Sequence, residues 1–401
     1  MKDERKERTM DFLTIAMDMA WPVAVAIAWI AGEFGHRVSR LPRISIYGVT
    51  GFLLGQTGLF GQATNGAVML LANVAFGLIL FEFGYRINLK WLRVNPWMAV
   101  TGVVEAVGSF AAVFALAYWT GMSTVASLLL ASLAMSTSPA AILRIINESR
   151  SSGQVTERVL HLSALNCALA VFAFKVIVGL WTFQSSGSLL QAAWNGFIVL
   201  LASVALGTLF GGALPGLLRR VSSPCNDATV AFAIAVILLV ALTHTLKLSP
   251  VLAALTFGIT ARHRRTAPSQ TQRNFGALGD LLTVLLFVFI AATLDWRQVV
   301  AGFSLGLALV AVRQLVKVAA VLMFARVSGI SWRKGALTGL ALMPMSVFVI
   351  LLLEQARYIG IELPDRLAPL ASATLLLELA GPILTQRALQ AAGEAREITE
   401  Q

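Results

Sequence analysis

Apolar residues are gathered into long runs that recur along the whole chain, with short polar connections between them. About twenty apolar residues are enough to cross a bilayer as an α-helix. Because backbone polar groups in lipid must be satisfied within their own segment, each run is predicted to be helical. Thirteen segments are predicted, at 11–33, 44–60, 67–85, 98–119, 122–146, 157–181, 189–216, 228–245, 249–262, 277–294, 298–325, 334–354 and 366–388. The ninth is short, which leaves a re-entrant or extended conformation open.

Composition supports an all-α membrane protein. The 401 residues are 57% hydrophobic and only 13% charged, with a mean hydropathy of +0.78. The net charge of +11 comes from basic residues between the apolar runs, as the positive-inside rule predicts, so no nucleic-acid partner is expected. Cys167 and Cys225 do not form a disulfide or metal motif. Walker A, GxSxG and HExxH patterns are missing too, so we expect no enzyme and no cofactor.

The basic residues are distributed unevenly between alternate connections. Eighteen Lys and Arg residues lie in or beside the connections that follow odd-numbered segments. The opposite connections hold four: Lys247, Arg297, Arg357 and Arg366. The first set is therefore predicted to be cytoplasmic, which puts the C-terminus inside and the N-terminus in the periplasm. No soluble regulatory domain is predicted, so residues 1–401 are interpreted as a single transmembrane domain in a bacterial inner membrane.

Two predicted helices are interrupted at related positions. The fifth contains Ser136-Thr137-Ser138-Pro139, and the twelfth contains Met343-Pro344-Met345-Ser346. Proline removes a backbone donor and clashes with the preceding turn. One such proline is usually a packing kink, but these two lie seven segments apart and so run in opposite directions. The pair therefore indicates an inverted repeat, in which unwound helices bind ions near the midplane.

Several polar side chains are predicted at mid-depth in the bilayer, where ionisable groups usually have a function. Asn166 and Cys167 lie on the sixth segment, and Arg313 and Lys317 lie four apart on one face of the eleventh. Two buried cations need an acidic or carbonyl partner. Glu105 on the fourth segment and Glu378 on the thirteenth are the candidate acids. The hydroxyls of Thr137 and Ser138 are further candidate ligands.

Four stretches, taken in order, resemble the monovalent cation:proton antiporter superfamily, closest to its bacterial sodium/hydrogen and potassium/proton exchanger branch. They are LANVAFGLILFEFGYRINLKWLR from Leu71, STSPAAIL from Ser136, LSPVLAALTFGITARHR from Leu248 and LLLELAGPILTQRALQAAGE from Leu375. The resemblance implies a core bundle, in which two broken helices cross at Pro139 and Pro344, and a dimerisation bundle. It also implies a homodimer, with a monovalent cation and a proton as the transported partners.

The resemblance assigns the central residues, with one departure. In the family, an aspartate on the helix after the first break binds the cation or the proton, commonly after Asn; here the pair is Asn166-Cys167. Arg313 or Lys317 matches the family's basic residue before the second break. A thiol is neutral near neutral pH and competes poorly for sodium or potassium, so the usual mechanism does not transfer unchanged.

Three functions stay open on these residues. The first is cation/proton antiport through another carboxylate, Glu378 or Glu105, with Asn166 and Thr137 as neutral ligands. The second is transport of another solute on the same scaffold, such as an anion, because Arg313 and Lys317 leave the core positive. The third is a membrane protein that does not transport.

The charge asymmetry predicts the location of the C-terminus. Alkaline phosphatase folds to its active form only in the periplasm, so a fusion after Gln401 should be inactive in intact bacteria. Strong phosphatase activity from that fusion would reverse the predicted orientation.

Overall fold

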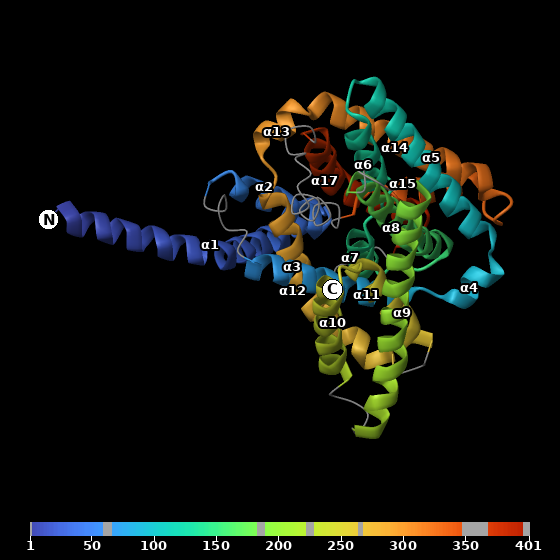
Figure 1. The fold of residues 1–401 in the computed structure, drawn as a ribbon, viewed down its shortest axis with the longest axis horizontal. Helices are drawn as coiled ribbons and strands as arrows, with labels where there is room; N and C mark the ends of the chain where they lie inside the picture. The colour runs from blue at the N-terminus through green and yellow to red at the C-terminus, as the bar shows by residue number, and fades with distance from the viewer. Residues whose placement is uncertain are drawn as a thin grey trace.

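A computed structural model describes residues 2–58, 66–182, 189–221, 228–263, 268–346 and 368–395, which are mostly helical and contain no strand (Figure 1). The helices in chain order are α1 (Lys2–Ser39), α2 (Arg43–Gly55), α3 (Gly66–Arg86), α4 (Leu89–Val94), α5 (Trp97–Trp119), α6 (Thr124–Ala134), α7 (Pro139–Ser149), α8 (Gln154–Thr182), α9 (Leu189–Val221), α10 (Ala228–Thr245), α11 (Pro250–His263), α12 (Pro268–Ala292), α13 (Trp296–Ala301), α14 (Phe303–Ala325), α15 (Trp332–Ala341) and α17 (Ala368–Ala391). The all-α prediction is confirmed.

Helices occupy all thirteen predicted segments, and the fifth is split into α6 and α7. The ninth is α11, a regular helix, so an extended conformation there is wrong. Five spans in the described ranges are long and apolar enough to cross a membrane: Trp97–Trp119, Thr124–Ser149, Gln154–Leu180, Trp194–Leu217 and Phe303–Ala325. Thirteen crossings therefore remain a prediction. Cys225, Arg357, Arg366 and residues 347–354 of the twelfth segment lie outside the described residues.

The short helix α4 occupies a connection where the apolar pattern predicts none, and the short helix α13 forms the start of the eleventh predicted segment, separated from α14 at Gly302. The Asn88 side chain accepts hydrogen bonds from the backbone N–H groups of Lys90 and Trp91 and so begins α4. Asp295 caps α13 in the same way, through the backbone N–H of Arg297. Asn and Asp are favourable N-cap residues because their side chains satisfy donors that the first turn leaves free.

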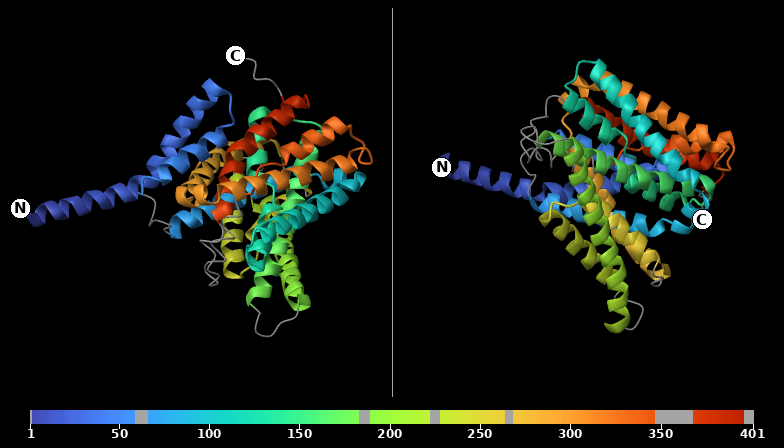
Figure 2. Two further views of the ribbon diagram at one scale, coloured as in Figure 1. Left: turned by 90° about the horizontal axis from the view of Figure 1, so that it is seen from above. Right: turned by 45° about the vertical axis from the view of Figure 1, so that its right-hand side comes forward.

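The helices pack as two bundles. The first contains α1, α2, α3, α9, α10, α11 and α12, and the second contains α5, α6, α7, α8, α14, α15 and α17. In Figure 1, α5 and α14 run side by side along the upper edge of the second bundle. Figure 2 shows α9 and α10 projecting from the opposite side, with the long α1 reaching away from both. This division corresponds to the predicted dimerisation and core bundles.

The connections gather at two ends, in agreement with the predicted alternation. At one end, Gln56 lies just after α2 and Leu294 lies just after α12. The Gln56 Nε2 donates a hydrogen bond to the Leu294 carbonyl at 3.0 Å. At the other end the Glu394 carboxylate accepts from the backbone of Val155 and Thr156 at 2.9 and 2.8 Å. These contacts join the connection after the fifth segment to the chain after the thirteenth. Which end faces the cytoplasm remains a prediction.

Glycines set the closest approach inside the first bundle. A Cβ on Gly84 of α3 would lie 2.2 Å from the Leu255 carbonyl oxygen of α11. On α11, a Cβ at Gly258 would lie 2.1 Å from the Phe81 carbonyl oxygen of α3. Both distances are far below van der Waals contact, and the atoms met are backbone atoms. Glycine at both positions therefore lets the two helix backbones touch, as small residues do at membrane helix interfaces.

Gly84→Ala should lower the midpoint of thermal unfolding in detergent, because the added methyl forces α3 and α11 apart, at a cost on the order of 1–3 kcal/mol. Gly216→Ala on α9 is the matched control, since a Cβ there meets nothing within 4 Å. The control should be neutral or stabilising, because Ala favours a helix by up to about 1 kcal/mol over Gly. Equal midpoints for both variants would contradict the close packing.

Candidate functional site

The two predicted breaks meet in space. Helix α6 ends at Ala134, and α7 starts at Pro139, where Ser138 caps it by accepting from the Ala141 N–H at 3.2 Å. Helix α15 ends at Ala341, and residues 342–346 are not helical. The Ser138 N–H donates to the Pro344 carbonyl at 2.9 Å, so the two interrupted segments cross at the positions predicted from their prolines.

Arg313 of α14 holds the crossing together. Its guanidinium donates to three carbonyl oxygens: Ala134 at 2.5 Å, Ser136 at 2.6 Å and Met343 at 2.8 Å. Ala134 and Ser136 lie at the first break and Met343 lies at the second. Where a helix is interrupted, such carbonyls lack the N–H donors that a continuing helix would supply. The side chain is 1% exposed, so its charge is compensated by these dipoles rather than by water. Arg313 therefore stabilises the crossing, and its planar guanidinium is suited to this because it presents several donors in fixed directions.

Lys317, one turn further along α14, forms a buried ion pair with Glu105 of α5. Both side chains are fully buried. The Lys317 ammonium also donates to Thr137 Oγ1 at 3.2 Å and to the Met135 carbonyl at 3.3 Å. The pair therefore connects α14, α5 and the first break.

Asn166 and Cys167 of α8 complete the cluster. Asn166 Nδ2 donates to Glu105 Oε2 at 2.6 Å and to Thr137 Oγ1 at 3.1 Å. The Cys167 thiol donates to the Thr137 carbonyl at 3.0 Å. Asn166 Oδ1 is buried and has no hydrogen-bond partner among the described residues. Thr137 thus lies at the centre of a group that we call the crossing cluster, made of Glu105, Thr137, Asn166, Cys167 and Lys317.

Most of the predicted site residues come together here. Ser138, Pro139, Pro344 and Arg313 build the crossing, and the crossing cluster lies directly against it. Sequence analysis missed Ser109, whose hydroxyl donates to Glu105 Oε1 at 3.3 Å. The signal was available, since Ser109 follows Glu105 by four residues and so shares its helix face. With a neutral thiol, the cluster and Arg313 together hold one more positive than negative charge.

Glu378 makes no hydrogen bond to any residue of the crossing cluster. It projects from α17 into a small cavity beside Pro344, Met345 and Ser346, on the other side of the second break. Neither carboxylate oxygen has a hydrogen-bond partner in the described part of the chain. The sequence offered Glu105 and Glu378 as alternative partners for the two cations, and only Glu105 has that position.

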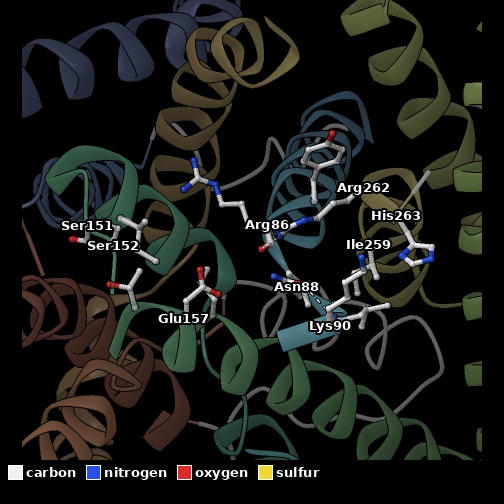
Figure 3. A pocket seen from close by; sticks show the side chains of 15 residues that line it. Arg86, Asn88, Lys90, Ser151, Ser152, Glu157, Ile259, Arg262 and His263 are labelled. Atoms are coloured by element: carbon white, nitrogen blue, oxygen red, sulfur yellow. Dashed lines mark hydrogen bonds between the residues drawn. The ribbon is translucent and has the colours of Figure 1, made fainter. Parts of the chain in front are cut away.

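A much larger cavity, of about 810 Å³, contains none of the predicted site residues. It opens at the end where the connections after odd-numbered segments gather, between α3, α8 and α11. In Figure 3, the Arg262 side chain reaches the backbone carbonyl of Arg86, the Arg86 side chain extends away from Arg262, and Glu157 lies on the facing helix. Four basic residues line it, Arg86, Lys90, Arg262 and His263, and one acidic residue, Glu157. It is therefore a mainly basic cavity at one end of the protein.

Comparison with known proteins agrees with this arrangement. Residues 23–390 match the family described as sodium/hydrogen exchanger, transmembrane. A structure of the sodium proton antiporter MjNhaP1 from Methanocaldococcus jannaschii at pH 8 superposes with a TM-score of 0.71 and 14% identity, covering 95% of this chain and 97% of that one. An electron-microscopy structure of the same antiporter gives a TM-score of 0.69 and 16% identity, covering 93% and 94%.

These structural likenesses establish the fold, including its two bundles and crossed broken helices. The family match spans most of the chain and covers every residue of the crossing cluster. The resemblance seen in the sequence motifs is thereby confirmed at the level of the superfamily. The chain belongs to the sodium/hydrogen exchanger family of multi-pass membrane transporters.

Proposed function

We propose that the chain exchanges a monovalent cation, sodium or potassium, for protons, and that Glu105 supplies the carboxylate that the family's aspartate supplies elsewhere. The observation that carries this proposal is the position of Glu105. Its carboxylate accepts from Asn166 at 2.6 Å, pairs with Lys317 and lies beside Thr137 at the crossing. Carboxylate, hydroxyl and amide oxygens are suitable ligands for hard cations, and broken helices provide such sites in transporters.

The exchange follows from competition between Lys317 and the cation. A cation that binds Glu105 has Thr137 Oγ1 and the unpartnered Asn166 Oδ1 as further oxygen ligands. It takes the place of the Lys317 ammonium, which is then buried beside a second positive charge. An isolated buried ammonium is unfavourable and tends to lose its proton. One proton therefore leaves as one cation binds, and return of the proton to Lys317 expels the cation.

The same contacts disfavour an anion as the transported solute. All three carbonyl bonds of Arg313 are needed where the broken helices cross. Lys317 is already neutralised by Glu105. Neither cation is free to receive an anion without breaking the crossing or exposing the buried acid.

The oligomeric state, the membrane and the orientation of the chain are also part of the proposal. We infer a homodimer formed through the first bundle, in a bacterial inner membrane, with the C-terminus in the cytoplasm. The motif resemblance supports the dimer, and the distribution of Lys and Arg supports the orientation. Residues 1–401 act as one transmembrane domain in this proposal.

Glu105→Gln should reduce exchange at least about tenfold, because it removes the only carboxylate of the crossing cluster and leaves Lys317 unpaired. The measurement is proton flux in proteoliposomes under an imposed pH gradient, with sodium, potassium or choline chloride added outside. Glu82→Gln is the matched control: Glu82 is also buried, but it is bonded to Asn147 and lies outside the crossing cluster.

Wild type should respond to sodium or potassium and not to choline, and the control should respond as wild type does. Cation-dependent flux that persists in Glu105→Gln would remove Glu105 from the mechanism. Flux that follows the chloride gradient, with no cation dependence, would favour the anion alternative.

Cys167→Ser should leave exchange close to that of wild type, because neither side chain carries a charge. Cys167→Asp should add pH-dependent sodium or potassium exchange above wild type. The new carboxylate would lie beside Asn166 and within reach of Lys317. The double variant Cys167→Asp with Glu105→Gln should then retain exchange that Glu105→Gln alone has lost. If Cys167→Ser abolishes exchange while Cys167→Asp adds nothing, the thiol has its own role and its match to the family's aspartate is wrong.

A further inference from the structure

The Glu378 carboxylate has no assigned partner although it is buried. The residue is 7% exposed, and both oxygens lack a hydrogen bond to any described residue. An ionised carboxylate in such a position is strongly disfavoured unless an opposite charge compensates it. No ion pair to Glu378 forms within the described ranges. Every other buried Glu in that part of the chain, Glu82 and Glu105, is hydrogen-bonded.

A cavity with room for about one water molecule lies at this carboxylate. Its volume is about 10 Å³, near the minimum that a single water needs. Besides Glu378, its polar lining comes from the side chains of Ser346 and Thr374. Ser346 is 1% exposed, and its hydroxyl also has no hydrogen-bond partner of good geometry among the described residues. A buried carboxylate without a partner and a buried hydroxyl beside the Cys167 thiol thus line one cavity.

The packing around the cavity keeps Glu378 at the second break. Gly381, one turn after Glu378, lets α17 approach the break so closely that a Cβ there would lie 2.8 Å from the Pro344 Cα. Gly48 of α2 lies against the other side, where a Cβ would be 3.4 Å from the Glu378 Cγ. Phe287 and Ile290 of α12 close the cavity with apolar surface. The carboxylate therefore lies at the seam between the two bundles.

We propose that this cavity is a second cation site, distinct from the crossing cluster, which holds one dehydrated sodium-sized ion. Glu378 is its anionic ligand, and Ser346 and Thr374 contribute neutral oxygens. Thr374 precedes Glu378 by one turn on α17 and so lies on the same face. A small monovalent cation supplies both the missing charge and the missing ligand contacts. The cavity, of about 10 Å³, has no room for an ion together with its hydration shell, so these oxygens have to replace the water that the ion loses.

The two sites differ in what a cation must displace. At Glu105 it has to replace Lys317, whereas at Glu378 no cationic side chain in the described ranges has to move. Ser346 lies beside the Cys167 thiol, so the second site adjoins the crossing cluster. The inference rests on the proposed cation exchange for the identity of the ion, but its binding can be measured without transport.

The test is equilibrium binding of radioactive sodium to the purified full-length protein, together with thermal unfolding in sodium chloride against choline chloride at equal ionic strength. Wild type should bind two sodium ions for each chain. Glu378→Gln should lose one of them, and Glu105→Gln should lose the other. Ser346→Ala should weaken only the ion that Glu378→Gln removes. Glu82→Gln serves again as the matched buried-acid control and should bind both.

The outcomes separate this inference from the proposed function. If Glu378→Gln binds sodium as wild type does, the second site is wrong, while exchange in proteoliposomes still stands. Suppose instead that wild type shows no exchange, and that Glu378→Gln binds one sodium ion fewer than wild type. The second site then stands and the proposed function fails. Loss of both ions in Glu378→Gln would overturn an independent site. Should that variant fail to fold, unchanged binding in both Ser346→Ala and Thr374→Val would overturn the proposal equally.

Discussion

Backbone carbonyls freed by two helix breaks, in the buried centre of a membrane protein, must find donors other than water. Each unsatisfied carbonyl at such a position is costly, so irregular backbone survives at membrane depth only where protein groups compensate it. Arg313 supplies three donors in one rigid plane, to Ala134, Ser136 and Met343. The bond between Ser138 and Pro344 then fixes the two breaks against each other. The positions of Thr137, Lys317 and the whole crossing cluster depend on this arrangement.

Arg313 and Lys317 illustrate how far the sequence could predict the site. Their spacing correctly put both on one face of a helix, and the two prolines correctly located the breaks. The sequence did not show which cation would bond to carbonyls and which to an acid, because that depends on how α14 is rotated against α5. For the same reason Glu105 and Glu378 were equivalent candidates in sequence, although the structure puts only Glu105 beside Lys317.

The missed features have similar causes. Helix α4 lies in a connection that carries no apolar period, and only its capping residue Asn88 marks it. Helix α13 falls largely within the predicted eleventh segment, but the break that separates it from α14 at Gly302 was not predicted. Ser109 was missed because a serine in an apolar helix usually bonds to its own backbone, so its bond to Glu105 becomes visible only once that acid is placed. The apolar runs themselves predicted the helices well, because burial in lipid imposes one solution on the backbone.

The thiol at Cys167 changes the charge balance in a way that bears on coupling. A carboxylate there would make the cluster and Arg313 neutral together, whereas the thiol leaves one positive charge in excess. A cation entering beside a charged Lys317 would meet a repulsion of about 4 kcal/mol, for a separation of about 4 Å and an effective dielectric constant of about 20. That energy corresponds to roughly a thousandfold loss of occupancy.

In the proposed exchange, a cation can therefore stay at Glu105 only after Lys317 has given up its proton. A site with two carboxylates has a second negative charge, which can compensate a bound cation while the lysine keeps its proton. With the single acid of this cluster, that intermediate state is suppressed. In the proposed mechanism, a thiol at Cys167 in place of the family's carboxylate removes one ligand and at the same time tightens the link between cation binding and proton release. A thiol at this position is thus compatible with strict exchange in the proposed mechanism, because Glu105 and Lys317 are the only pair of opposite charges at the crossing among the described residues.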